Sequence, residues 1–146
     1  MSRPYFETSF GYYITEFLIL YYIISAQLWR LTSKGHLENK LRDWRYIEPD
    51  LTKIDPDEGV IEVQNIGKVL TMNNKTKEVE YEVKKTPVPT SQKWTFGSPD
   101  GHRWQTIQHA DTGLYLTARN KLNIPILTVE SEIGKRYLNN DFLLKE

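Results

Sequence analysis

The sequence predicts a small all-β fold. Short runs rich in aromatic and β-branched residues recur along the chain, and several of them alternate apolar with polar residues. Residues typical of turns separate these runs, and helical periodicity is scarce. Many short strands with frequent turns favour a barrel or a sandwich, because closing a sheet removes the exposed edges of its strands.

Several runs have the composition and alternation of strands. They are 60–63, 68–72, 79–83, 93–96, 104–107, 114–117 and 126–129. The intervening segments supply proline at turn starts or glycine where a turn needs a positive φ angle. These segments are 55–59, 87–89, 98–101 and 111–113. The glutamates of 78–83 alternate with apolar residues, which predicts a strand with one solvated face.

Length and composition restrict the class of protein. The chain has 146 residues, which suits one domain, and its 39% hydrophobic and 26% charged residues are typical of a globular protein. Because 19 Lys and Arg residues balance 19 Asp and Glu residues, no net positive field favours nucleic acid as a partner. The absence of cysteine excludes disulfides and thiolate zinc sites, and it favours a cytoplasmic location over a secreted or membrane-anchored one.

Residues 1–26 form an apolar N-terminal segment ahead of the domain predicted over 27–146. The window 10–31 has 22 residues and could just cross a bilayer. It contains Glu16 and Arg30, however, and it is rich in Tyr and Ile, which favour strands. Three interpretations follow: buried strands, a membrane anchor or uncleaved signal, and a cleaved signal. Membrane association therefore stays open.

An internal repeat is the sharpest signal in the sequence. The segments 27–31 and 92–96 both read Gln-x-Trp-x-apolar, and a polar turn and Gly-His follow each of them. A second pattern of Gly, any residue, apolar, Leu, Thr, apolar occurs at 67–72 and 113–118, and 45–49 is a weaker third copy. The glycine makes a turn, and the alternate apolar residues are expected to point inward.

These motifs resemble the repeats of ricin-B-type lectins. In that family each unit of a β-trefoil carries a turn glycine, a strand similar to Gly-x-x-Leu-Asp-Val and a later Gln-x-Trp. The best local match is 100–118, and the resemblance extends over 27–129. It implies a β-trefoil, complete or partial, with Trp29 and Trp94 in the structural core. It also implies reversible binding of a glycan or glycoprotein, without catalysis or a cofactor.

The chain departs from the family in two respects. Trp29 and Trp94 are 65 positions apart, beyond the roughly 20–50 residues of one repeat, so either a unit carries an insertion or a Gln-x-Trp has been lost. At the positions of the sugar-binding aspartate the chain has Glu48, Thr71 and Thr117, so a carboxylate remains at Glu48 alone. The predicted carbohydrate site consists of Glu48, Asn39, Asp111 and His109, with Trp44 as the ring that stacks on the sugar.

Motifs of catalysis are absent from the sequence. It contains no nucleophile elbow, P-loop, dinucleotide fingerprint or zinc-protease helix, and its histidines lack the spacing of a metal site. We therefore expect a binding module rather than an enzyme, with neither metal nor cofactor. The alternative is a trefoil that has lost sugar binding and acts as a protein-interaction module or protease inhibitor, which Thr71 and Thr117 favour. The sequence indicates neither the glycan nor the oligomeric state.

Overall fold

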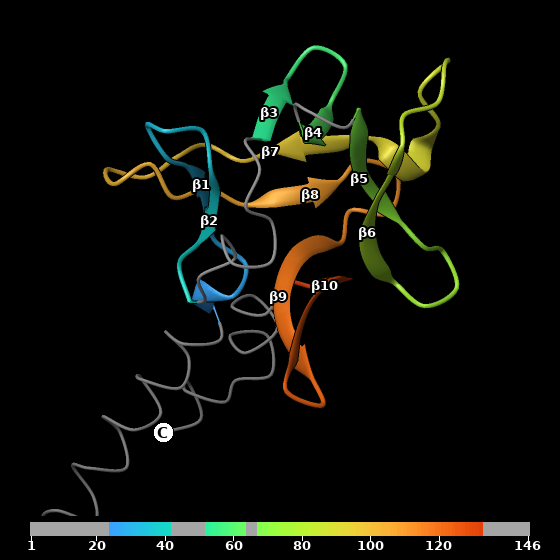
Figure 1. Cartoon of the computed structure of the whole chain (residues 1–146). Helices are drawn as coiled ribbons and strands as arrows, with labels where there is room; N and C mark the ends of the chain where they lie inside the picture. Colours follow the sequence, from blue (N-terminus) through green and yellow to red (C-terminus); the bar gives the residue numbers. More distant parts are fainter. Residues whose placement is uncertain (1–23, 42–51, 64–66, 133–146) are drawn as a thin grey trace, which may run out of the picture.

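Most of the alternating runs become antiparallel strands in the computed structural model, which describes residues 24–41, 52–63 and 67–132 (Figure 1). Eight strands form one curled sheet in the order β3-β4-β5-β6-β10-β9-β8-β7, and β1 pairs with β2 as a separate ribbon. The predicted all-β class is confirmed. The predictions for residues 1–23 and for the weaker repeat at 45–49 lie outside the described residues.

The strands are short and follow one another closely. They are β1 (Trp29–Leu31), β2 (Leu37–Asn39), β3 (Thr52–Asp55), β4 (Val60–Val63), β5 (Lys68–Met72), β6 (Glu78–Val83), β7 (Trp94–Phe96), β8 (Ile107–His109), β9 (Tyr115–Lys121) and β10 (Ile124–Glu130). A 3₁₀ turn, η2 (Thr90–Gln92), precedes β7. No helix within the described residues is both long and apolar enough to span a membrane.

The sequence patterns place most strands correctly. The bounds of β4 and β5 agree with the prediction, and β6, β7, β9 and β10 differ from it by one to four residues at their ends. The strand expected at 104–107 is wrong, because β8 begins only at Ile107. The Asp100 carboxylate accepts hydrogen bonds from the N–H groups of His102 and Trp104, and these bonds hold the preceding segment in an irregular loop.

The predicted solvated face of β6 is largely present. Val79 is buried and Tyr81 packs against the core, so the alternate glutamates lie on the other face. Val83, however, is 67% exposed at the end of the strand. The apolar stripe of β6 therefore ends at Tyr81.

Three hairpins of the described residues share one register. The first residue of each first strand faces the last residue of the second strand, and these pairs are Trp29 with Asn39, Thr52 with Val63, and Trp94 with His109. Two residues further along, the facing pairs are again equivalent: Leu31 with Leu37, Ile54 with Ile61, and Phe96 with Ile107. The hairpins β1–β2, β3–β4 and β7–β8 are thus structural repeats.

Backbone hydrogen bonds join these hairpins in a closed ring. In each hairpin the donor is the N–H of the first residue of the first strand. The acceptor is a carbonyl in another hairpin, just before its second strand begins. The bonds run from Trp29 to Gln105, from Trp94 to Gly59 and from Thr52 to Gly35, over 2.8, 2.7 and 2.7 Å. The bond at Trp29 is reciprocated, since the N–H of Gln105 donates to the Trp29 carbonyl over 2.9 Å. Because every hairpin both donates and accepts, the ring has no free end.

The core lies inside this ring and continues under the hairpins β5–β6 and β9–β10. Trp29 and Trp94 are 0% and 1% exposed. The indole N–H of Trp94 donates to the carbonyl of Leu70 over 3.1 Å, and that of Trp29 donates to the carbonyl of Leu116 over 2.9 Å. A tryptophan that buries about 150–250 Å² contributes about 4–6 kcal/mol of hydrophobic stabilisation. Each indole also satisfies its one donor.

The ring places a specific demand on Gly59. Gly59 and Gly67 both have left-handed φ angles, +75° and +65°, but only a Cβ at Gly59 would meet a backbone atom, the Trp94 oxygen at 2.8 Å. We predict that Gly67→Ala lowers the free energy of unfolding by about 1–2 kcal/mol, the penalty of a left-handed alanine. Gly59→Ala should lower it by about 1–1.5 kcal/mol more, because the bond to Trp94 is lost. Urea denaturation measures both, and equal losses would contradict the ring.

Candidate functional site

Three of the five residues predicted to bind carbohydrate lie within the described part of the chain, and these three do not form one surface site. Trp44 and Glu48 lie outside the described residues. Asn39 is 5% exposed. Its amide donates to the carbonyls of Ala26 and Leu28 over 3.0 and 3.1 Å, and its Oδ1 accepts from the N–H of Leu41 over 3.0 Å. The Asn39 side chain therefore anchors the backbone on either side of β1–β2.

His109 lies at the position of β7–β8 that Asn39 occupies in β1–β2. It is 1% exposed, and its ring meets Trp94 edge to face with centroids 5.2 Å apart. Its Nδ1 shares a hydrogen bond of 3.0 Å with the hydroxyl of Thr112. Asp111 lies exposed in the same turn. His109 thus contributes to the core, and Asp111 alone of this pair faces solvent.

The two threonines that the sequence patterns align with the sugar-binding aspartate of ricin-B-type lectins make contacts within the fold. Thr71 and Thr117 are 7% and 0% exposed. Each hydroxyl donates to the carbonyl two residues earlier, over 3.0 and 2.8 Å. Each also accepts from the glutamine of a Gln-x-Trp, Gln92 over 3.1 Å and Gln27 over 3.0 Å. The two repeat motifs of the sequence are therefore bonded to each other in pairs.

A polar hollow of 180 Å³ lies on the outer face of β5–β6. Its lining residues are Thr71, Asn73, Thr76, Glu78, Glu80 and Glu82. Glu80 faces Thr71 directly across the two strands. Glu78 forms an ion pair of 3.1 Å with Lys121, whereas Glu80 and Glu82 form no ion pair with another described residue. The hollow thus presents hydroxyl, amide and carboxylate groups close together.

The chemistry of this hollow suits a ligand rich in hydroxyl or ammonium groups. Ionised carboxylates accept hydrogen bonds, and an amide both donates and accepts. The carboxylates repel anions. Among the described residues no group of His, Asp and Glu side chains is arranged to hold a metal ion. The hollow can therefore recognise a neutral or cationic ligand through direct hydrogen bonds.

Sequence reasoning missed Asn73 and Glu80 as candidate site residues. The alternation within 78–83 places Glu80 on a solvated face, and Glu80 is exposed in the structure. The turn 73–77 joins two strands, so counting outward from it places Thr71 opposite Glu80 and Asn73 at the rim. The hairpin register, rather than any sequence motif, therefore indicates that Thr71, Asn73 and Glu80 lie together.

Comparison with protein-family models, with curated proteins and with solved structures found no significant match for this chain.

Burial lowers the pKa of His109 from the ordinary value, and a backbone hydrogen bond with Thr90 opposes that shift. The unfolded chain therefore takes up the proton first as the pH falls. The stabilisation that neutral His109 contributes to the folded chain is complete above about pH 6.5, the ordinary pKa of histidine. It is lost as the pH falls below that value towards the lowered pKa.

We predict that His109→Asn, which copies Asn39, makes the free energy of unfolding depend less on pH between 7 and 5. The exposed His102→Asn is the matched control. Urea denaturation at a series of pH values checks this. The interpretation fails if the pH dependence of the His109→Asn protein equals that of the unmodified protein.

Proposed function

We propose that this chain is a binding module with a degenerate β-trefoil fold of the ricin-B type. The ring of three equivalent hairpins, with two further hairpins packed beneath the tryptophans, supports this interpretation. A trefoil consists of three such hairpins in a barrel and three more that cap it. The weaker sequence repeat at 45–49 falls between β2 and β3 in the chain, outside the described residues.

We further propose that the polar hollow on β5–β6 binds a carbohydrate. The observation that carries the proposal is the set of hydroxyl, amide and carboxylate groups around Thr71, the position at which the family recognises sugars. Thr71 itself is engaged by Gln92. The sugar is therefore contacted by the residues around Thr71, above all by Glu80, which faces Thr71 across the strand pair.

The charge of the hollow selects among sugars. Glu78, Glu80 and Glu82 disfavour sialic and uronic acids, because like charges repel at short range. They favour neutral sugars with adjacent hydroxyls, and amino sugars, whose ammonium group can take the role that Lys121 has beside Glu78. No aromatic residue lines the hollow among the described residues, so stacking adds nothing there. We expect weak binding, with Kd about 1 mM.

A second candidate function is protein interaction through the tip of β9–β10. Leu122 and Ile124 are 89% and 63% exposed on this hairpin. Leu122 and Asn123 both have left-handed φ angles, 53° and 64°, and leucine is disfavoured there. An exposed leucine kept at a strained turn position favours a contact role.

Removal of one carboxylate tests the carbohydrate proposal. We predict that Glu80→Gln weakens binding of the preferred sugar about tenfold, because a hydrogen bond to a charged group contributes about 1.5–3 kcal/mol. Glu62→Gln removes a carboxylate from the neighbouring strand β4, outside the hollow, and should leave binding unchanged. A glycan array identifies the sugar, and calorimetric titration measures each Kd.

The protein-interaction function makes the opposite prediction. In that case the folded protein binds no glycan but captures a protein partner, and Leu122→Asn together with Ile124→Thr abolishes that capture. This pair of results would show that the carbohydrate proposal is wrong. The same pair of substitutions leaves sugar binding intact if the hollow is the site, since neither residue lines it.

A further inference from the structure

A second cavity, of 280 Å³, opens where the three repeated hairpins meet. Its walls include Leu31 and Leu37 from β1–β2, Ile54 from β3 and Ile107 from β8. Two arginines, Arg30 and Arg103, also line it. The cavity shares no residue with the polar hollow on β5–β6. It is therefore a separate site with an apolar interior and cationic groups.

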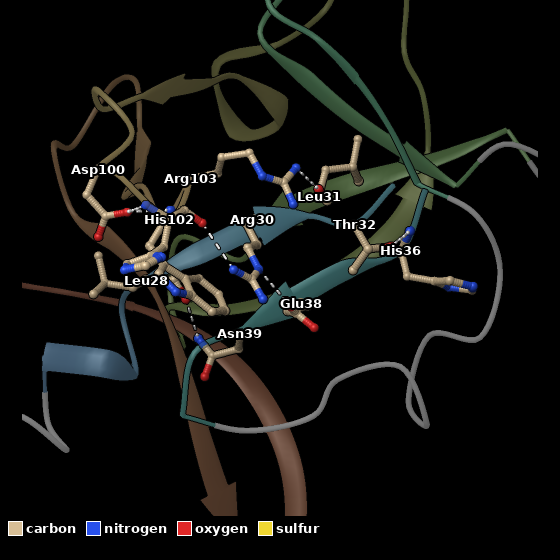
Figure 2. Close-up of polar contacts among 11 residues, drawn as sticks. Leu28, Arg30, Leu31, Thr32, His36, Glu38, Asn39, Asp100, His102 and Arg103 are labelled. Carbon is tan, nitrogen blue, oxygen red and sulfur yellow. Dashed lines mark hydrogen bonds and ion pairs between the residues drawn. The ribbon is translucent and has the colours of Figure 1, made fainter. Parts of the chain in front are cut away.

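The guanidinium of Arg30 is already engaged. Its Nε donates to the carboxylate of Glu38, and its Nη1 donates to the His102 carbonyl over 3.0 Å, as Figure 2 shows. The guanidinium carbon also lies 4.0 Å from the centre of the Trp104 ring. Glu38 offsets the charge of Arg30, so this arginine acts as a fixed part of the wall.

The guanidinium of Arg103 differs, because it forms no ion pair with any described residue. Its Nη1 donates to the Leu31 carbonyl over 3.3 Å, which is a long contact that leaves most of its donors for other partners (Figure 2). Among the described residues that line this cavity, Arg103 therefore carries the charge that no carboxylate offsets.

The backbone around Arg103 is held in a specific and strained form. Arg103 has a φ angle of 69°, a left-handed conformation that side chains other than those of Gly, Asn and Asp rarely adopt. Its N–H donates to the carbonyl of Asp100, and the carboxylate of Asp100 accepts from the N–H groups on either side of Arg103. These bonds fix the loop so that the guanidinium extends over β1. Strain retained at a cavity rim favours a functional role.

We propose that this cavity binds a small amphipathic carboxylate, with its apolar body among Leu31, Ile54 and Ile107 and its carboxylate on Arg103. The size of the cavity limits the ligand. At about 30 Å³ for each water, 280 Å³ corresponds to about nine waters, so a ligand of about that many heavy atoms fits. A medium-chain fatty acid or an arylacetic acid has this size, an apolar body and one carboxylate.

Other ligand classes fit the cavity less well. An inorganic phosphate would fill only its rim and would leave the apolar walls in contact with water. A sugar would place hydroxyl groups against Leu31, Ile54 and Ile107, which offer no hydrogen-bond partner. A neutral apolar molecule would gain nothing from Arg103. The combination of apolar walls and one uncompensated guanidinium therefore favours a carboxylate with an apolar body.

Octanoate and octanol are the matched probes, since they share one chain length and differ in charge. On the intact chain we expect octanoate to bind at least tenfold more tightly than octanol in calorimetric titration. Arg103→Gln should weaken octanoate about tenfold and leave octanol unchanged. Lys53→Gln removes the same charge from β3, next to Ile54 but on the other face of the strand, and should change neither affinity.

Two further variants separate a binding defect from a folding defect. Arg103→Gly relieves the left-handed strain, so it should keep the unfolding midpoint of the unmodified chain while still losing octanoate. Ile54→Trp fills the cavity and should abolish binding of both probes. Glu80→Gln, in the polar hollow, should leave octanoate binding unchanged, so failure of the sugar site and of this site are distinguishable.

The proposal is overturned if octanoate does not bind the folded chain. It is overturned equally if octanoate and octanol bind alike and Arg103→Gln affects neither, because the cavity would then be an apolar hollow without selectivity for an anion.

Discussion

Three backbone hydrogen bonds join the hairpins β1–β2, β3–β4 and β7–β8 in a closed ring, and the rest of the structure depends on them. The N–H groups of Trp29, Thr52 and Trp94 each bridge two hairpins that would otherwise expose unpaired edges. Because no hairpin has enough apolar surface to be stable alone, each needs the other two. The cavity of 280 Å³ exists only where all three meet, so its walls form when the ring closes.

The Gln-x-Trp motif connects this ring to the hairpins beneath it. Each tryptophan donates to a leucine carbonyl, and each glutamine two positions earlier donates to the threonine that follows that leucine. Repeated side-chain bonds of this kind specify where β5–β6 and β9–β10 lie. They also engage the hydroxyl groups at the positions where a ricin-B-type lectin would hold its sugar. Both hydroxyls are therefore engaged within the fold, and in the proposed carbohydrate site the carboxylates beside Thr71 are the groups that would contact the ligand.

Much of the fold could be predicted from the sequence, because turn residues and period-two alternation are local signals. β4 and β5 follow directly from them. β1 lies within a Gln-x-Trp repeat, but three residues are too few to show the alternation of a strand, and the same holds for β2. The expected strand at 104–107 failed because the Asp100 carboxylate competes for local N–H groups. Side-chain competition of that kind is invisible to strand propensity.

The candidate sites were harder to predict than the strands. Asn39 and His109 have side chains suited to binding a ligand, yet both lie in the interior opposite a tryptophan, where the amide bonds to backbone groups and the imidazole Nδ1 bonds to Thr112. The polar hollow depends on the cross-strand register of β5–β6, and the apolar cavity depends on contacts between distant hairpins. Long-range closure has no signal in a single sequence.

Amide hydrogen exchange on the intact chain tests the closed ring most directly. If the ring opens only on global unfolding, the N–H groups of Trp29, Thr52 and Trp94 should share one opening free energy, equal to the global value. Fast exchange at Trp29 with slow exchange at Trp94 would mean that β1–β2 detaches by itself, and the closed ring would be contradicted.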